Sequence, residues 1–204
     1  YGEIYGTAWA SGNLNWKPEK NVSVSVGLKQ NFTNQENYIK AVVFRDKLTN
    51  EITSTNSAPY TPYNEVGDSK RNGVELDMQF QPFSQTIISG NYSYLIAKNS
   101  DGTVERRRPR HSFNSQIEYQ FAKRKGHAAL SATRIAKNYD GYPVGWASRK
   151  LPDYTKFDLT SSFNITSNVS ITGQISNLFD KEYSDNWGYR SAGRSYYLTA
   201  ATKW

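Results

Sequence analysis

VSITGQISNLFDKEY, residues 169–183, is the stretch that decides the class of fold. It begins with an alternation in which Val169, Ile171 and Ile175 are apolar and the residues between them are small or polar. Side chains of a β-strand point alternately to its two faces, so this pattern predicts a strand with one apolar face and one polar face. The apolar face of such a strand packs either in a dry protein core or against membrane lipid.

The same alternation recurs along the chain. Apolar residues fall in phase, with polar residues between them, in four further segments: 21–32, 73–83, 112–121 and 155–163. The final strand, 195–204, ends on the aromatic Trp204, and residues 1–16 also read as a strand. About 11 strands are predicted in total, and no segment has the apolar spacing of a helix. The predicted fold class is all-β.

The composition excludes a helical membrane protein but not a membrane barrel. The chain has 204 residues, of which 37% are hydrophobic, and its mean hydropathy is -0.74. No stretch approaches the roughly 20 consecutive apolar residues of a spanning helix. A barrel strand needs only about 9–11 residues, and half of these face the lumen and can be polar. Aromatic residues make up 14% of the chain, as in the interface girdles of such barrels.

The predicted connections alternate in length. Short turns are expected at 17–21, 81–85, 122–126 and 164–168, and long polar connections at about 54–72, 98–110, 138–152 and 178–190. Short turns on one rim and long loops on the other are typical of an outer-membrane barrel. A soluble meander has no reason to alternate in this way.

Charged residues within the strands indicate which face of the sheet is in contact with water. Glu75 and Asp77 lie two residues apart on one expected strand, as do Lys156 and Asp158 on another. Burying such unpaired charges in a dry core would cost several kcal/mol each, whereas a water-filled lumen accommodates them. The chain is therefore predicted to form an antiparallel transmembrane β-barrel with its apolar face towards lipid. A soluble β-sandwich that serves as a binding module stays open as the alternative.

Few residues in the chain suit catalysis or metal binding. The chain has no cysteine, and its two histidines, His111 and His127, have no neighbours at a metal-ligand spacing. No Ser–His–acid arrangement or phosphate-cradling glycine loop stands out, so neither an enzyme nor a cofactor is expected. The net charge of +7 is scattered, which argues against a nucleic-acid partner. The exception is one run of arginines: Arg106, Arg107, Arg108 and Arg110.

Several blocks of sequence resemble TonB-dependent outer-membrane receptors. These are NLFDKEY (177–183) followed by GYRSAGRSYYLTAATKW (188–204), YNEVGDSKRNGVELDMQF (63–80) and LPDYTKFDLTSSFNIT (151–166). The resemblance implies a 22-stranded barrel with an N-terminal plug, embedded in the outer membrane of a Gram-negative bacterium. By this likeness, residues 1–204 are the C-terminal portion of the barrel, without the plug. The implied partners are the TonB complex, which acts through the missing plug, the missing half of the barrel, outer-membrane lipid and lipopolysaccharide.

Within this family, three local matches are similar to vitamin B12 (cobalamin) receptors: ERRRPRHSFNSQIEY (105–119), YDGYP (139–143) and GYRSAGRSYYL (188–198). The likeness implies that Arg107, Tyr139 and Tyr189 face bound cobalamin, with Arg106 and Arg108 beside them. The implied function is active uptake of a scarce metal-chelate nutrient. An anionic ferric siderophore or haem is the alternative ligand, and lipopolysaccharide phosphates are an alternative partner for the arginine run.

Overall fold

The computed structural model describes residues 7, 11–32, 36–55, 58–141 and 148–203. These residues form β-strands and no helix, and hence no helix long and apolar enough to cross a membrane is found among them. The strands are β1 (Lys20–Asn31), β2 (Tyr38–Thr49), β3 (Ile52–Ser54), β4 (Pro62–Asn64), β5 (Asp68–Phe83), β6 (Thr86–Lys98), β7 (His111–Phe121), β8 (Gly126–Ala136), β9 (Tyr139–Gly141), β10 (Ser148–Lys150), β11 (Tyr154–Asn164), β12 (Val169–Ser176) and β13 (Ser195–Thr202).

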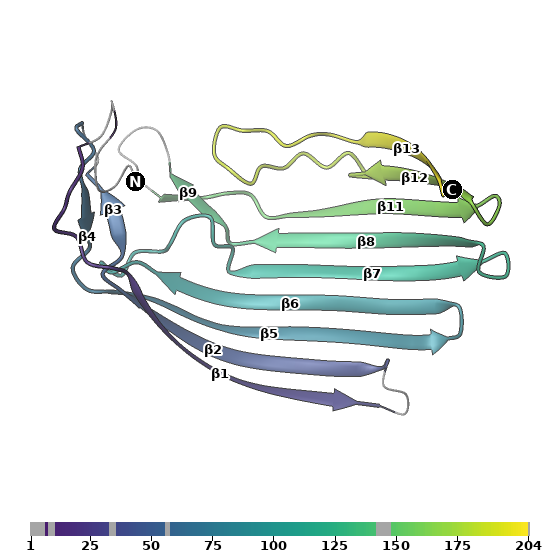
Figure 1. Ribbon diagram of the computed structural model, residues 1–204, viewed down its shortest axis with the longest axis horizontal. Helices are drawn as coiled ribbons and strands as arrows, with labels where there is room; N and C mark the ends of the chain where they lie inside the picture. The colour runs from purple at the N-terminus through teal and green to yellow at the C-terminus, as the bar shows by residue number, and fades with distance from the viewer. Residues whose placement is uncertain (1–6, 8–10, 33–35, 56–57, 142–147, 204) are drawn as a thin grey trace. The chain divides into compact units, whose positions relative to one another are not determined.

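Nine of these strands form one sheet, in the order β1-β2-β5-β6-β7-β8-β11-β12-β13 (Figure 1). Each strand pairs with the next long strand in the chain, and the pairs from β6 to β13 are antiparallel. Two small hairpins, β3–β4 and β9–β10, lie within long connections. The all-β prediction is confirmed: nine long strands and four short ones are described, against about 11 strands expected.

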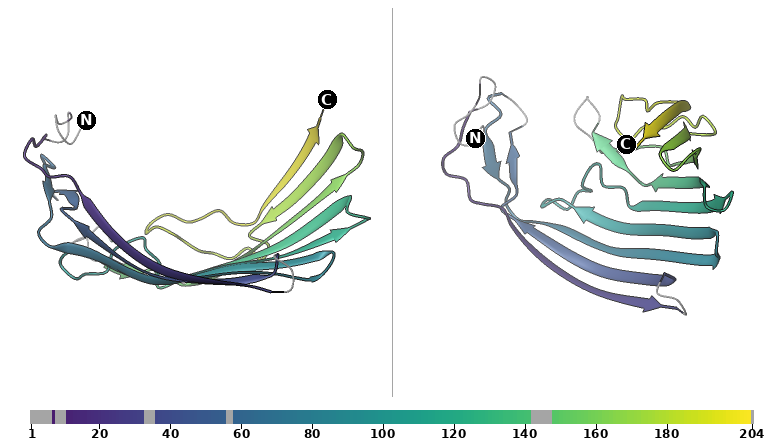
Figure 2. Two further views of the ribbon diagram at one scale, coloured as in Figure 1. Left: turned by 60° about the horizontal axis from the view of Figure 1, so that its bottom comes forward. Right: turned by 45° about the vertical axis from the view of Figure 1, so that its right-hand side comes forward.

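The chain divides into two compact units. The first comprises residues Tyr1–Val26, Phe44–Gly73 and Ile96–Glu105, and the second Gly27–Val43, Val74–Leu95 and Arg106–Trp204. In the first unit, Arg71 donates two hydrogen bonds to Glu105, of 2.8 and 2.9 Å. The second unit contains β7, β8, β11, β12 and β13, which Figure 2 shows as neighbouring, curved strands. Its long connections carry all the residues that the sequence analysis selected as ligand contacts.

The alternation of connection lengths is confirmed. The long strands are joined by short connections at 32–37, 84–85, 122–125 and 165–168, and by long ones at 50–67, 99–110, 137–153 and 177–194. Because consecutive strands are antiparallel, connections of one kind lie at the same end of the strands. Within the second unit, the short turns and the long loops therefore occupy opposite ends of the sheet.

Two expectations for the N-terminal part meet a different outcome. The expected strand over 1–16 is wrong for residues 11–16, which lie outside any strand, whereas residues 1–6 and 8–10 lie outside the described residues. The expected turn at 17–21 is wrong: residues 17–19 are coil, and β1 begins at Lys20. The reason is hydrogen bonding to residues 47–49 positions later in the chain. The Asn13 amide donates to the Pro62 carbonyl (2.8 Å), and Asn64 pairs with the backbone of Lys17, so this segment is held against the β3–β4 hairpin instead of a strand. Trp204 lies outside the described residues.

The strand register separates an apolar face from a polar one. One row of directly opposed residues crosses six strands of the second unit and is apolar throughout: Ile88, Ile117, Leu130, Leu159, Ile175 and Tyr196. The neighbouring row on the opposite face is polar: Ser89, Gln116, Ser131 and Asp158. Such rows arise because each strand alternates with a period of two and the register aligns these alternations.

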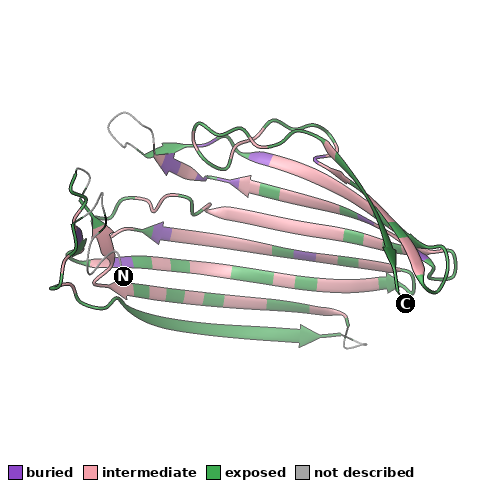
Figure 3. Cartoon of the chain, turned by 45° about the horizontal axis from the view of Figure 1, so that its top comes forward, coloured by how far each residue is buried: buried purple, intermediate pink, exposed green. Residues whose placement is uncertain are grey.

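The apolar face is not packed into a compact core. The buried hydrophobic residues within the described chain are few and mostly small: Ala97, Ala129, Ala136, Leu151 and Tyr154. Figure 3 shows how little of the sheet is buried. Ile117, Leu130 and Tyr196 of the apolar row are exposed, and no second sheet of comparable size exists among the described residues to cover them. The arrangement is that of a barrel wall whose outer face requires lipid, and not of a soluble sandwich.

Candidate ligand site on the long connections

Asp140 of β9 joins three of the long connections of the second unit. Its side chain is almost fully buried, with 4% exposure. Asp140 Oδ1 accepts hydrogen bonds from Arg107 Nε (3.0 Å), in the β6–β7 connection, and from the Gly141 N–H (2.8 Å). Asp140 Oδ2 accepts one from the Trp187 N–H (2.7 Å), in the β12–β13 connection. One carboxylate thus holds three segments that are far apart in the sequence.

The hydrogen bonds keep Asp140 ionised. Burial would raise the pKa of its carboxyl, because a low-dielectric environment disfavours the charged form. The Trp187 and Gly141 N–H groups and the Arg107 guanidinium outweigh burial, so the pKa of Asp140 lies below its usual range. At neutral pH the group is therefore an anion that serves only as an acceptor for these donors.

Arg107 is held through its backbone and Nε, while most of its side chain is exposed. Its backbone has a positive φ of 58°, and its N–H donates to the Tyr139 carbonyl over 2.8 Å. The side chain remains 68% exposed although Nε is bonded to Asp140. A guanidinium carries five N–H donors, so Arg107 has donors left for an anionic ligand. Its sequence neighbours differ in exposure: Arg106 is half-buried and Arg108 is exposed.

The two tyrosines selected from the sequence lie on connections held by Asp140. Tyr139 is half-buried and directly precedes Asp140. Tyr189 is 76% exposed and follows Trp187 by two residues. Its N–H donates to the Asn186 carbonyl (3.3 Å), and the Ser184 hydroxyl lies within hydrogen-bond distance of the carbonyls of Asn186 and Tyr189, so that its single proton is shared between them or donated to one. The structure thus brings Arg107 and Tyr139 into direct contact and carries Tyr189 on the third connection of the cluster.

A second cluster supports the β12–β13 connection. The Tyr154 hydroxyl donates to Asp185 Oδ1 over 2.7 Å, and the Tyr154 ring packs on Tyr183 with centroids 4.4 Å apart. The Asn138 amide donates to the Asp185 carbonyl (3.3 Å) and the Asn138 carbonyl accepts from the Leu151 N–H (2.8 Å). These contacts join the β8–β11 and β12–β13 connections independently of Asp140.

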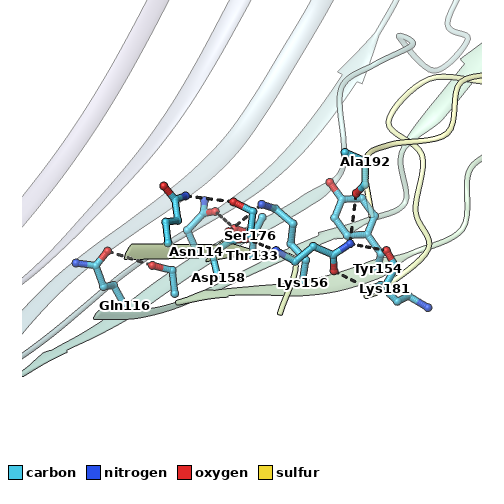
Figure 4. Close-up of polar contacts among 12 residues, drawn as sticks. Asn114, Gln116, Thr133, Tyr154, Lys156, Asp158, Ser176, Lys181 and Ala192 are labelled. Atoms are coloured by element: carbon cyan, nitrogen blue, oxygen red, sulfur yellow. Dashed lines mark hydrogen bonds and ion pairs between the residues drawn. The ribbon is translucent and has the colours of Figure 1, made fainter. Parts of the chain in front are cut away.

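A polar network follows the polar face of the sheet from strand to strand (Figure 4). Thr133 donates to Asn114 Oδ1 (3.0 Å), and Ser131 donates to Gln116 Oε1 (3.2 Å). These four residues help line a hollow of about 370 Å³. Paired amides and hydroxyls of this kind suit a wall in contact with water.

The polar network continues into the long β12–β13 connection. Lys156 pairs with Asp158 Oδ2 (2.8 Å), and Asp158 Oδ1 accepts from the Asn177 N–H (2.8 Å). Asn177 is buried and bonds through its side chain to the backbone of Lys181 and to the Ala192 carbonyl. The ion pair between Lys156 and Asp158 explains how the water-facing side of β11 carries both charges. The hydrogen bond from Asn177 to Asp158 fixes the start of the β12–β13 connection.

The histidines make ordinary hydrogen bonds. His111 Nδ1 lies 2.8 Å from the Tyr92 hydroxyl, and His127 Nδ1 lies 3.0 Å from the Ser162 hydroxyl. Within the described part of the chain, no three histidine, cysteine or carboxylate side chains group as metal ligands would.

The residues that hold the site together could not be identified from the sequence. Asp140 lies inside the YDGYP segment that drew attention to Tyr139, but nothing in the sequence marks it as the partner of Arg107. Trp187, Asp185, Asn138 and Tyr154 were missed as well. The one available signal was position: all of them except Tyr154, the first residue of β11, lie in long connections, and connecting segments carry functional residues more often than strands do.

The chain belongs to the TonB-dependent receptor family. The family model described as TonB dependent receptor-like, beta-barrel matches residues 1–178. This match includes the first 60 residues, in which the sequence analysis found no sharp motif. Members are outer-membrane β-barrel proteins of Gram-negative bacteria, so the apolar row identified above faces lipid and the polar row faces the barrel interior.

Solved structures of large barrels share the fold. The copper transporter OprC has a TM-score of 0.80 and 20% identity, with 99% of this chain and 34% of that chain covered. The siderophore receptor PiuA from Acinetobacter baumannii has a TM-score of 0.73 and 23% identity, with 98% and 31% covered. The ferripyoverdine receptor of Pseudomonas aeruginosa has a TM-score of 0.76 and 19% identity, with 92% and 27% covered. The chain thus spans about a third or less of these proteins and forms a section of a larger barrel.

Proposed function

We propose that this chain is the C-terminal portion of the barrel of a receptor that takes up an anionic ferric siderophore. The long connections bind the ligand at the outer surface, and TonB drives its entry through a plug supplied elsewhere in the receptor. No bond is made or broken in this process. The C-terminal placement rests on the likeness of residues 177–204 to the closing segment of the family.

The observation that carries the proposal is the set of hydrogen bonds that the Asp140 carboxylate accepts from Arg107, Gly141 and Trp187. A buried carboxylate holds Arg107 by one nitrogen and leaves 68% of its side chain exposed, next to Tyr139 and on a scaffold shared with Tyr189. Arginine recognises carboxylate and related anionic groups through paired hydrogen bonds, and tyrosine rings offer large rigid surfaces at a low entropic cost. A large ligand that carries anionic groups, such as an anionic ferric siderophore, would use both kinds of contact. The named relatives PiuA and the ferripyoverdine receptor support this class of ligand.

Cobalamin is the second candidate ligand. It is favoured by the local likeness of 105–119, 139–143 and 188–198 to cobalamin receptors, and Arg107, Tyr139 and Tyr189 would serve it as contacts too. The solved structures named above are siderophore and copper receptors and give cobalamin no support. We therefore place the siderophore first.

A binding experiment distinguishes the two ligands. The complete receptor, purified in detergent, is titrated with ferric enterobactin, ferripyoverdine and cyanocobalamin while its tryptophan fluorescence is followed. The variants Arg107→Ala, Tyr139→Ala and Tyr189→Ala are compared with Lys123→Ala, an exposed cation of a short turn. Tight binding of a ferric siderophore, weakened by the first three variants and not by the fourth, is expected. Binding of cyanocobalamin alone would replace the first proposal with the second, and unaltered affinity in all three variants would remove these residues as contacts.

A further inference from the structure

A basic hollow lies at the end of the sheet opposite the ligand site. It has a volume of about 460 Å³ and lies among the β7–β8 connection, the β11–β12 connection and the end of β13. Three cations line it, Arg124, Lys125 and Lys203, and its described lining contains no carboxylate. Within the described part of the chain, these three side chains form no ion pair. Among the described residues, positive charge is thus concentrated here without an ion-pair partner.

Backbone hydrogen bonds build the basic hollow. The Asn164 N–H donates to the Lys125 carbonyl (2.8 Å), and the Lys203 N–H donates to the Asn168 carbonyl (2.9 Å), so the three segments are joined. The Thr166 hydroxyl accepts from the Asn168 and Val169 N–H groups (3.1 and 3.0 Å) and orders the β11–β12 turn. The cations therefore extend from a connected framework.

The strand register places the basic hollow on the polar face. Asn164 is opposite Ser170, and Ser170 is opposite Ala201. Two residues further along each strand lie Ser162, Thr172 and Thr199, which continue the polar face. The hollow thus opens towards the water-filled interior and not towards lipid. Because short turns of outer-membrane barrels are periplasmic, it lies at the periplasmic mouth.

We propose that the basic hollow binds an acidic peptide segment presented at the periplasmic end of the barrel. Carboxylate side chains would pair with Arg124, Lys125 and Lys203, and the amides of Asn164 and Asn168 would bond to the peptide backbone. The exposed aliphatic side chain of Ile165 adds apolar contact. A lipid headgroup fits less well, because the polar-face register turns the hollow away from the bilayer. The volume lies within the range of about 300–1,000 Å³ that is usual for small ligands and suits a few residues of peptide.

This proposal depends on the orientation of the strands and not on the transported compound. The complete receptor in detergent is titrated with fluorescein-labelled hexaglutamate, and fluorescence anisotropy is measured, with hexaglutamine as the uncharged comparison. Arg124→Gln, Lys125→Gln and Lys203→Gln are each expected to weaken hexaglutamate binding by roughly two- to fivefold, as for exposed ion pairs. The triple variant is expected to abolish measurable binding, and salt is expected to weaken binding to the unaltered receptor.

The matched control is Lys123→Gln, because Lys123 lies in the same turn and is exposed but does not line the hollow. It should bind hexaglutamate as the unaltered receptor does. Equal loss with Lys123→Gln would show nonspecific charge attraction and overturn the proposal. Absence of hexaglutamate binding would also overturn the proposal. Displacement of the labelled peptide by tripolyphosphate at a far lower concentration than by unlabelled hexaglutamate would overturn it too, because it would indicate a phosphate site. Siderophore binding by the triple variant, measured separately, should be unchanged.

Discussion

Arg107 and Asp140 form an unequal pair: Arg107 Nε lies 3.0 Å from Asp140 Oδ1, and the two side chains are 68% and 4% exposed. The buried partner fixes the exposed one. Because the Trp187 N–H bonds to the other oxygen of the same carboxylate, the pair also sets the position of the β12–β13 connection. Much of the proposed ligand surface therefore depends on one carboxylate that need not touch the ligand.

Replacing that carboxylate tests its positioning role. Asp140→Asn keeps the shape of the side chain but removes charge and one acceptor oxygen. Hydrogen bonds to charged groups contribute about 1.5–3 kcal/mol, and the exposure of Arg107 reduces its share. We expect siderophore affinity to fall by roughly tenfold, with faster proteolysis of the 177–194 connection and unchanged heat-modifiable mobility of the barrel. A protease pattern identical to that of the unaltered receptor would contradict this role.

The hydrogen bonds to the Asp140 carboxylate should weaken in acid, when the carboxylate becomes protonated. The pKa of Asp140 is depressed in the folded state, so its contribution is fully present above the unfolded value of about 3.9 and is lost as pH falls through the folded value. The β12–β13 connection should thus stay ordered from neutral pH to about pH 4 and loosen below it. Tryptophan fluorescence from pH 7 to pH 3 measures this, with Trp187→Phe identifying the signal. In Asp140→Asn the Trp187 transition should be absent, and its persistence would assign it to another carboxylate.

Tyr154 provides a second support for the same connection. Tyr154→Phe removes the hydroxyl that donates to Asp185 but keeps the ring contact with Tyr183. A loss of about 0.5–1.5 kcal/mol is expected locally, as for a typical hydrogen bond. Hydrogen exchange of residues 177–194 should accelerate, whereas exchange in β7 and β8 should not. Tyr154→Leu, which also removes the ring, should accelerate it further; equal effects of the two variants would mean that the hydroxyl contributes nothing.

Two neighbouring residues of β12 test the assignment of the faces. Ile175 belongs to the apolar row, and Gln174 lies on the opposite face. Ile175→Arg should reduce folding into lipid vesicles by up to about 2–4 kcal/mol, because arginine is costly on the lipid face near the bilayer centre. Gln174→Arg should have little effect, since its side chain meets water. Heat-modifiable mobility after refolding measures the folded fraction, and a reversed order of the two variants would invert the faces.

The sequence by itself predicted the strands and most of their connections, but it left a soluble β-sandwich open as an alternative to the barrel. Strand alternation has a period of two residues and is local, so the segments around Ile175, Phe157 and Ile117 could be read without knowing their partners. Connection lengths are local too, and their alternation indicated the barrel. The coil at 11–19 could not be foreseen, because Asn13 and Lys17 take their partners from the β3–β4 hairpin, about 50 residues later in the chain.

Only the tertiary structure decided which loop residues act together. Arg107, Tyr139 and Tyr189 were selected one by one from local likeness, and their roles as ligand contacts remain predictions. Their common dependence on Asp140 arises from hydrogen bonds across sequence separations of 33 and 47 residues, which no local periodicity encodes. The same holds for the basic hollow, where Arg124 and Lys203 share a site because antiparallel pairing returns every second connection to one end of the sheet. Local alternation fixes the faces of each strand, whereas contacts between distant loops exist only once the strands are in register.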